Sequence, residues 1–174
     1  MKLTNKYNLP EAYIRAVSSK NNKPDNSTFR ITRLISPPRI TQLLIRHWHE
    51  IEADVSDFLW AILGTAVHNV LEYSDKEKYL TEHRITCNIN NCSVSGQVDL
   101  YDKQKKKIID WKTASIWKYI MGDNAEWEKQ FNCYAHLLRM NGYEVNEIEA
   151  VALFKDWHES GTVKKEYPPA PVIS

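Results

Sequence analysis

The stretch SVSGQVDLYDKQKKKIIDWKTAS, residues 93–115, holds two runs rich in β-branched and aromatic residues on either side of the polar run KQKKK. Runs of this composition are typical of β-strands, and a polar run between them is typical of a turn. A third such run, HRITCNIN at 83–90, comes just before and is separated from the second by the polar NNC. We therefore predict three consecutive antiparallel strands over 83–115.

Helical patterns flank these strands. From Phe58 to Leu71 apolar residues form a wide stripe at helical spacing, with Asp54 or Ser56 as N-terminal cap, which predicts a largely buried helix. Residues 125–143 carry apolar side chains three and four positions apart and end in Asn-Gly, which predicts a second helix. The apolar run at 146–157 predicts a buried strand. This order, αβββαβ, predicts an α/β fold with a mixed, mainly antiparallel sheet flanked by helices.

The chain is predicted to form one domain, because 174 residues with 43% apolar content can bury one sizeable core. We place this core at 36–158 and expect it to begin with a helix that follows the prolines and extends toward Ile51. Residues 1–35 are predicted as an N-terminal arm with a short helix and a mobile loop at 20–28. Residues 159–174 are predicted as an irregular tail, because prolines disfavour regular structure.

Composition narrows the function classes. The formal net charge is +1, so a polyanionic partner would have to be held by local groups or a bound metal. Three cysteines without CxxC spacing argue against a disulfide framework, a zinc knuckle and an iron–sulfur cluster. No stretch approaches the roughly 20 apolar residues of a membrane span, and the N-terminus lacks a signal-peptide pattern. We therefore expect a cytoplasmic protein without membrane contact.

The acids and the lysine of the predicted hairpin suggest chemistry. Side chains alternate along a strand, so Asp110 and Lys112 share one face, and the turn could bring Asp99 across from Asp110. Ile109 and Trp111 would then point into the core. Two nearby carboxylates suit a hard divalent cation such as Mg²⁺ or Mn²⁺, and an ammonium beside it could position a water molecule. The alternative is a solvated salt-bridged face, worth perhaps ~0.5 kcal/mol.

Four short motifs occur in order on the expected elements: GTAVHNVLE at 64–72, GQVD at 96–99, DWK at 110–112 and QFNCY at 130–134. Over about residues 36–158, the sequence resembles the RecB-type nucleases of the PD-(D/E)XK superfamily, which have G-T-x-x-H-x-x-x-E, G-x-x-D, D-x-K and Q-x-x-x-Y at these places. The resemblance implies a restriction-endonuclease-like core. Relatives with an iron–sulfur cluster have four flanking cysteines, which this chain lacks, so it resembles the cluster-free, phage-encoded exonuclease-like branch.

The resemblance also implies roles for individual residues. The metal ligands would be His68, Asp99, Asp110 and the carbonyl of Trp111, with Lys112, Asp110 and Asp99 as the catalytic group. Glu72, one turn beyond His68, would lie behind these ligands, either near a second metal's water or near Lys112; a structural salt bridge is the alternative. Nucleic-acid contacts would come from Gln130, Tyr134 and Arg39, although Tyr134 could simply pack and Arg39 could simply be solvated.

The function implied is a Mg²⁺- or Mn²⁺-dependent DNA nuclease, more specifically an exonuclease, that hydrolyses phosphodiesters with metal-activated water in DNA replication, recombination or repair. Two alternatives stay open from the residues: a nuclease-fold DNA-binding module without activity, and a metal-dependent hydrolase of other phosphoesters. The oligomeric state is not indicated by the sequence.

Overall fold

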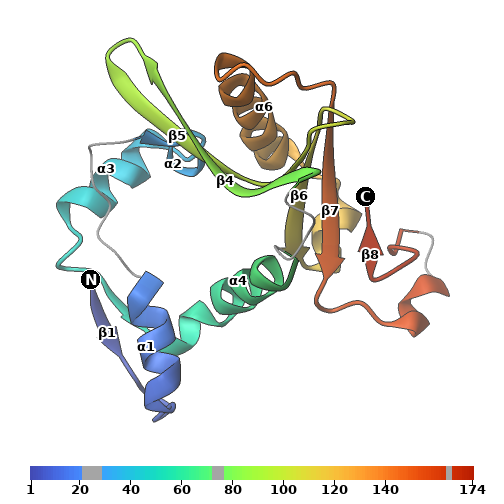
Figure 1. Cartoon of the computed structure of the whole chain (residues 1–174). Helices are drawn as coiled ribbons and strands as arrows, with labels where there is room; N and C mark the ends of the chain where they lie inside the picture. The colour runs from blue at the N-terminus through green and yellow to red at the C-terminus, as the bar shows by residue number, and fades with distance from the viewer. Residues whose placement is uncertain (21–28, 72–76, 164–165) are drawn as a thin grey trace.

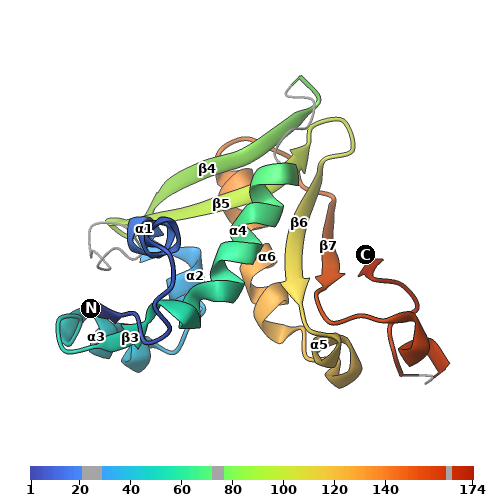
Figure 2. The same ribbon diagram turned by 90° about the horizontal axis from the view of Figure 1, so that it is seen from below.

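The computed structural model describes residues 1–20, 29–71, 77–163 and 166–174, and it builds a sheet with a long helix on each face (Figures 1 and 2). In chain order the elements are β1 Lys2–Thr4, α1 Glu11–Lys20, β2 Phe29–Arg30, α2 Ile31–Leu34, α3 Pro38–Arg46, β3 Glu52–Asp54, the 3₁₀ helix η1 Val55–Phe58, α4 Leu59–Leu71, β4 Tyr79–Ile89, β5 Cys92–Asp102, β6 Lys107–Ala114, α5 Ile116–Met121, α6 Ala125–Met140, β7 Glu147–Phe154, the 3₁₀ helix η2 Glu159–Val163 and β8 Val172–Ile173.

The six-stranded sheet has the order β2-β5-β6-β7-β8, with β4 paired to β5. The β4–β5, β5–β6 and β7–β8 pairs are antiparallel, which confirms the three consecutive antiparallel strands. The β6–β7 pair is parallel, because the chain crosses over through α5 and α6 before it returns. The predicted class, a mixed and mainly antiparallel α/β sheet flanked by helices, is therefore confirmed.

Strand β5 has a gap in its pairing along one edge. Strand β4 follows β5 from Cys92 to Asp102. On the opposite edge β6 pairs only with Leu100–Asp102, and β2 pairs only with Val94 and Ser95. Within the described residues, positions 96–99 thus have no strand partner on that edge. This gap is where β5 and β6 diverge.

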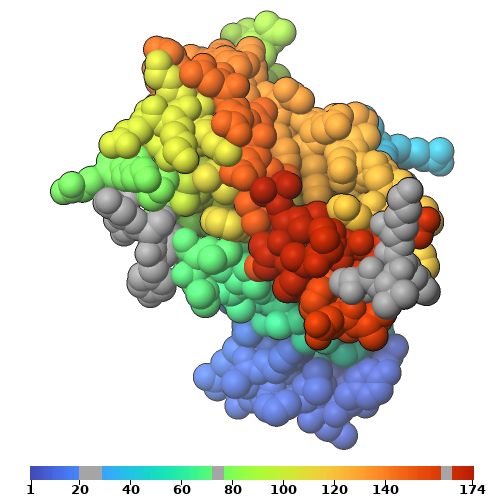
Figure 3. All heavy atoms as spheres, turned by 90° about the vertical axis from the view of Figure 1, so that its right-hand side faces the viewer, coloured from blue at the N-terminus to red at the C-terminus, as the bar shows by residue number. Residues whose placement is uncertain are grey.

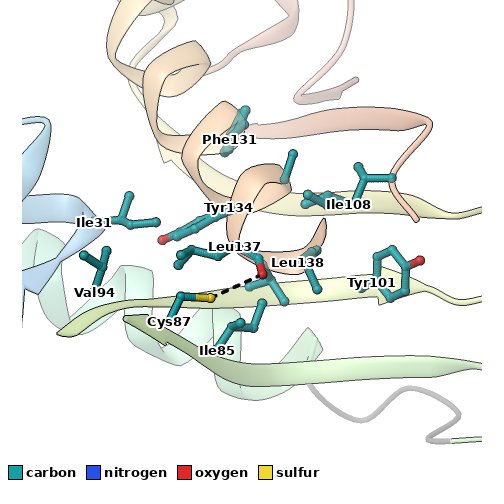
Figure 4. Packing of buried hydrophobic residues seen from close by; sticks show 13 residues of the cluster. Ile31, Ile85, Cys87, Val94, Tyr101, Ile108, Phe131, Tyr134, Leu137 and Leu138 are labelled. Carbon is teal, nitrogen blue, oxygen red and sulfur yellow. Dashed lines mark hydrogen bonds between the residues drawn. The ribbon is translucent and has the colours of Figure 1, made fainter. Parts of the chain in front are cut away.

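The main core lies between the sheet and α6. Leu137 and Leu138 of α6 are 1% and 0% exposed and pack against β4 and β5 together with Tyr134 (Figure 4). Burying each leucine stabilises the fold by about 1.5–3 kcal/mol. From β6 it is Ile108, 0% exposed, that enters this core. The expectation that Ile109 and Trp111 fill the core was wrong: they lie on the α4 side of β6, which is only half-buried.

Helix α4 crosses the other face of the sheet (Figure 2). Its Gly64 packs near β6, where a Cβ would lie 3.4 Å from Thr113 Oγ1. None of the residues of α4 is buried, and Trp60 and Leu63 are 54% and 42% exposed, so the prediction of a largely buried helix was wrong. The apolar stripe is wider than the contact with the sheet, and its outer part faces solvent.

The flanking segments contain more regular structure than expected. Strand β1 pairs in parallel with β3, and Asp54 caps η1 while it accepts hydrogen bonds from Thr4 and Lys6. The helix predicted toward Ile51 ends at Arg46, since β3 follows shortly afterwards. The prediction of an irregular tail was wrong, because η2 and β8 form there. Strand β8 begins directly after the last proline of the tail and pairs with β7. The predicted loop at 20–28 lies almost entirely outside the described residues.

Among the helices that the structure describes, none combines the length and hydrophobicity needed to cross a membrane. This agrees with the absence of an apolar segment of that length in the sequence.

Candidate metal centre

A cluster of ionisable side chains occupies the point where β5 and β6 diverge. The ladder between the two strands ends with the Leu100–Ile109 pair, so the next positions along each strand are Asp99 and Asp110. Asp99 Oδ2 accepts a hydrogen bond of 2.9 Å from the backbone N–H of Trp111. A side-chain carboxylate thus binds an N–H that β5 no longer reaches, which satisfies the donor where the backbone ladder stops.

Three ligand atoms come together above this point. His68 of α4, Glu82 of β4 and Asp99 of β5 place one nitrogen or oxygen atom each within 4.8 Å of one another. His68 Nδ1 lies 3.3 Å from Asp99 Oδ2 and 3.6 Å from Glu82 Oε1. The side chains are 30%, 25% and 10% exposed for His68, Glu82 and Asp99, so the group is open to solvent on the histidine side.

Glu82 is held in this group by its backbone and by its neighbours. Its φ of 47° lies in the left-handed region, which costs about 1–3 kcal/mol for a residue with a side chain. Its Oε2 accepts a hydrogen bond of 2.5 Å from Gln97 Nε2, and Gln97 Oε1 in turn accepts one of 2.6 Å from Arg84 Nη2. Strain combined with a chain of orienting hydrogen bonds is common at functional sites.

Sequence reasoning did not single out Glu82, although a signal was present. Asn90 and Asn91 form the β4–β5 turn with φ of 48° and 63°, as in the two-residue hairpin that asparagine favours. The register that follows from this turn pairs Thr81 with Leu100 and His83 with Val98, which leaves Glu82 opposite Asp99. Counting outward from the two asparagines would have placed a second acid beside Asp99.

Asp110 lies deeper than these three groups, with a side chain that is 2% exposed. Its Oδ2 is 2.7 Å from Lys112 Nζ, an ion pair, but this buried oxygen has no hydrogen bond among the described residues. Burial raises the pKa of Asp110 to about 6; the Asp99 charge adds to the rise, and the Lys112 ammonium opposes it. Lys112 therefore balances the negative charge of the buried Asp110 carboxylate only in part.

Lys112 is fixed from its other side by α6. Its ammonium donates a hydrogen bond of 3.1 Å to Gln130 Oε1, and Gln130 Nε2 donates one of 2.7 Å to Tyr134 Oη. Tyr134 is 4% exposed, and burial raises its pKa to about 12, so the phenol stays protonated. Its ring also explains the glycine of the GQVD motif, since a Cβ on Gly96 would lie 2.8 Å from the ring.

His68 is poised between binding a proton and binding a cation. The hydrogen bond to Asp99 raises the pKa of His68, burial opposes this, and the charges of Asp99, Glu82 and Asp110 raise it further. The same negative field that attracts a proton attracts a metal ion, and a metal ion must displace the proton in order to be bound by the ring nitrogen.

The residues predicted from the sequence are placed as follows. His68, Asp99, Asp110, Lys112 and Gln130 all belong to this cluster or touch a member of it. Trp111 joins the cluster through its N–H, and a role for its carbonyl stays a prediction.

Three other predicted site residues are placed differently. Tyr134 is buried behind Gln130 instead of facing outward. Arg39 is exposed on α3, which lies away from β6 in both ribbon views (Figures 1 and 2). Glu72 lies outside the described residues.

The donor set fits a divalent cation. Carboxylate oxygens with one imidazole nitrogen suit Mn²⁺ and, through the oxygens, Mg²⁺. The carboxylates of Glu82, Asp99 and Asp110 outnumber the single ammonium of Lys112, and the buried Asp110 Oδ2 lacks a hydrogen bond among the described residues. A cation would offset both features.

Comparison with known proteins bears on the fold. No family model matches the chain, and no curated protein is significantly similar to it. One solved structure with a similar fold is the crystal structure of SSO0001, which covers 83% of this chain and 71% of that chain with a TM-score of 0.62 and 18% sequence identity. At this identity the likeness concerns the fold alone, and it agrees with the α/β architecture described above.

Proposed function

We propose that this chain is a Mg²⁺- or Mn²⁺-dependent DNA nuclease of the RecB type within the PD-(D/E)XK superfamily. The observation that carries the proposal is the joint placement of His68, Asp99, Asp110 and Lys112 at the divergence of β5 and β6. These are the motif residues that the resemblance to this family singles out, and they come from one helix and two strands. We place its work in DNA replication, recombination or repair in the cytoplasm.

Each residue of the candidate centre has its own task in this proposal. His68, Asp99 and Asp110 would hold the cation, and Glu82 joins them because its carboxylate lies in the same group. When bound, the cation would lower the pKa of a water molecule and offset the negative charge that develops on a phosphodiester. Lys112 supplies three donors and no acceptor, so its ammonium can orient that water and stabilise charge on the phosphate oxygens.

The position of Lys112 supports this division of tasks. Asp110 lies on one side of the ammonium at 2.7 Å and Gln130 on the other at 3.1 Å. Gln130 is itself held by the buried Tyr134. In our proposal the Gln130–Tyr134 pair therefore positions the lysine, and contact with DNA through the Tyr134 ring is not part of it. Because its ammonium is already held from two sides, Lys112 would lose little conformational freedom when it orients the water molecule.

Two rival functions use the same residues differently. A DNA-binding module without activity has no need for a buried acid beside a lysine. The buried Asp110 carboxylate, whose charge is only partly balanced, therefore argues against such a module. A hydrolase of other phosphoesters would need the same cation but no DNA, and it is separated from a nuclease by its substrate alone.

Digestion of DNA tests the proposal. The purified chain is incubated with end-labelled linear DNA and with circular DNA, each with Mg²⁺, with Mn²⁺ and with EDTA, beside the Asp110→Asn variant. We expect loss of linear DNA with either metal, none with EDTA and none with the variant. Attack on linear but not circular DNA indicates an exonuclease, and cutting of circles indicates an endonuclease. Binding without cleavage would favour the inactive module, and hydrolysis of a generic phosphoester without DNA degradation would favour the third function.

A further inference from the structure

The two carboxylate oxygens of Glu82 have different partners. Oε1 is turned toward the candidate centre, where it lies 3.6 Å from His68 Nδ1. Oε2 accepts the hydrogen bond of 2.5 Å from Gln97 Nε2. Figure 3 shows α4, in green, and the first residues of β4, in a brighter green, on the same side of the molecule. One oxygen of Glu82 is therefore available to the centre, and the other is already bound by a side chain.

The direction of the hydrogen bonds at Gln97 is fixed by its two neighbours. A carboxylate can only accept and a guanidinium can only donate, whereas a side-chain amide does both. Gln97 Nε2 therefore faces Glu82, and Gln97 Oε1 faces Arg84 Nη2 at 2.6 Å. A reversed amide would set acceptor against acceptor and donor against donor. Arg84 thus keeps the Gln97 N–H directed at Glu82 Oε2.

The backbone holds these three side chains in place without a bound ion. Arg84 of β4 and Gln97 of β5 are register partners in the antiparallel ladder. Glu82 is two residues before Arg84, at the point where its left-handed φ of 47° interrupts the regular strand. A local distortion of this kind re-aims a side chain and is common beside functional sites. The arrangement of Glu82 is therefore built into the β4–β5 pair.

The number of oxygens that a carboxylate offers bears on which cation it binds. Ca²⁺ takes about six to eight oxygen ligands, and carboxylates often bind it through both oxygens. Mg²⁺ is smaller and demands an octahedral set of about six ligands at shorter distances, several of them water. A carboxylate whose second oxygen is held by Gln97 offers one oxygen unless that hydrogen bond breaks. This restraint disfavours the larger ion.

We propose that Gln97, held by Arg84, is a positioning residue that limits Glu82 to one oxygen ligand and so makes the centre select Mg²⁺ or Mn²⁺ over Ca²⁺. The inference rests on the divalent cation of the proposed function and deepens it, because it assigns the choice of ion to named residues. Gln97 occupies an unspecified position of the G-x-x-D motif, and Arg84 lies outside all four motifs. If the same contacts only stabilised the hairpin, they would affect the free energy of unfolding and not the choice between ions.

Titration calorimetry with MnCl₂ and with CaCl₂, in the absence of DNA, tests the inference. The variants are Gln97→Met, which keeps the length of the side chain but cannot donate a hydrogen bond, Arg84→Met and Arg84→Lys. The matched control is Gln104→Met, because Gln104 is exposed in the turn between β5 and β6. Circular dichroism and urea unfolding without metal report separately on the fold and on the stability of the hairpin.

We expect Gln97→Met to lower the ratio of Mn²⁺ affinity to Ca²⁺ affinity about tenfold, since a partner that orients a metal ligand is typically worth that much. Arg84→Met should lower the ratio less, Arg84→Lys should restore it because lysine still donates to the amide oxygen, and Gln104→Met should match the wild type. Both ions carry the same charge, so the lost charge of Arg84 affects both affinities alike and largely cancels in the ratio.

The outcomes separate this inference from the proposed function. An unchanged ratio in folded Gln97→Met, or an equal loss of affinity for both ions, would overturn the inference. If Gln97→Met does not fold, the ratio in Arg84→Met decides in the same way. A wild type that selects Mn²⁺ through Gln97 but degrades no DNA upholds the inference and overturns the proposed nuclease. A wild type that binds neither ion overturns both.

Discussion

Two lysine–carboxylate clusters lie on β6 and differ in what surrounds them. Near the start of the strand, Lys107 lies 2.7 Å from Glu147 and 2.9 Å from Glu149. Near its end, Lys112 lies 2.7 Å from Asp110. The distances are alike, but the carboxylates are 61% and 26% exposed in the first cluster and 2% exposed in the second. Proximity of opposite charges therefore does not distinguish them.

Burial does distinguish them, through its effect on the charges. In the first cluster the two glutamates raise the pKa of Lys107, and Lys107 lowers the pKa of Glu149, so each group stabilises the charged form of the other. In the second, burial raises the pKa of Asp110 to about 6 despite Lys112. The first is a surface salt bridge, and the second leaves negative charge for a cation to offset. The variants below test this contrast.

The largest expected effect is that of Asp110→Asn on DNA cleavage. The change keeps nearly the same volume and removes a charge from the proposed ligand set, and the loss of metal activation typically costs several kcal/mol. We expect the rate to fall about a thousandfold or more, with an unchanged circular dichroism spectrum. Glu149→Gln, from the other cluster, is the matched control and should cleave as wild type. Near-normal cleavage by folded Asp110→Asn would remove Asp110 from the catalytic group.

The next effect is that of Lys112→Ala, which should lower the single-turnover rate by about a hundredfold and leave DNA affinity nearly unchanged. The ammonium is held beside Asp110 and Gln130, where we propose that it acts on the water and the transition state. Lys107→Ala provides the comparison and should change neither quantity.

Affinity measured across salt concentrations separates this role from a simple phosphate contact. A phosphate clamp at Lys112 would instead weaken binding and reduce the salt slope by about one unit. An affinity defect with a normal maximal rate would contradict the catalytic assignment.

A smaller effect is expected for Glu82→Gln on metal affinity. Glu82 is the ligand candidate that the structure adds, and its carboxylate is oriented by Gln97. Titration calorimetry with Mn²⁺ should show binding weakened on the order of tenfold to a hundredfold. Glu149→Gln is a fair control, because the side chains of Glu82 and Glu149 are exposed to a similar extent, 25% and 26%. Unchanged Mn²⁺ affinity in Glu82→Gln would exclude Glu82 from the site.

The sequence was enough to predict those parts of the molecule that depend on local patterns. The strands over 83–115 and the helix over 125–140 were predictable because composition and spacing are local properties. The hairpin register that places Asp99 next to Asp110 followed from the short turn between β5 and β6. These local features were enough to predict the α/β class and the side-by-side acids.

What could not be predicted depends on packing between distant segments. Alternation along β6 gives two faces but does not say which one α6 covers, so Ile109 and Trp111 were placed in the core in error. An apolar stripe on a helix does not reveal that α4 would have only one side against the sheet. Strand β8 at the end of a proline-rich segment pairs with β7 through tertiary contacts that no local pattern indicates.

The smallest expected effect concerns the pH dependence of stability in EDTA. As pH rises, the contribution of Asp110 to stability should fall and that of Glu149 should grow. The pKa of Asp110 is about 6 in the folded chain and near 3.8 when unfolded. Between these values the folded state keeps a proton that the unfolded state has lost, so stability falls as pH rises from 4 to 6. Asp110→Asn lacks this term, and the wild type should lose on the order of 1 kcal/mol more than the variant over this range.

Glu149 behaves in the opposite way and makes the comparison sharp. Lys107 lowers the pKa of Glu149 below its ordinary value of 4.5, so the stabilising contribution of Glu149 grows as pH rises through that value and is lost as pH falls through the folded pKa. Over pH 4–6 the Glu149→Gln variant should therefore lose more stability with rising pH than the wild type, whereas Asp110→Asn should lose less. Urea titrations at each pH measure the free energy of unfolding of the wild type and of both variants. If the two substitutions changed the slope of this free energy against pH in the same direction, burial would not separate the two clusters.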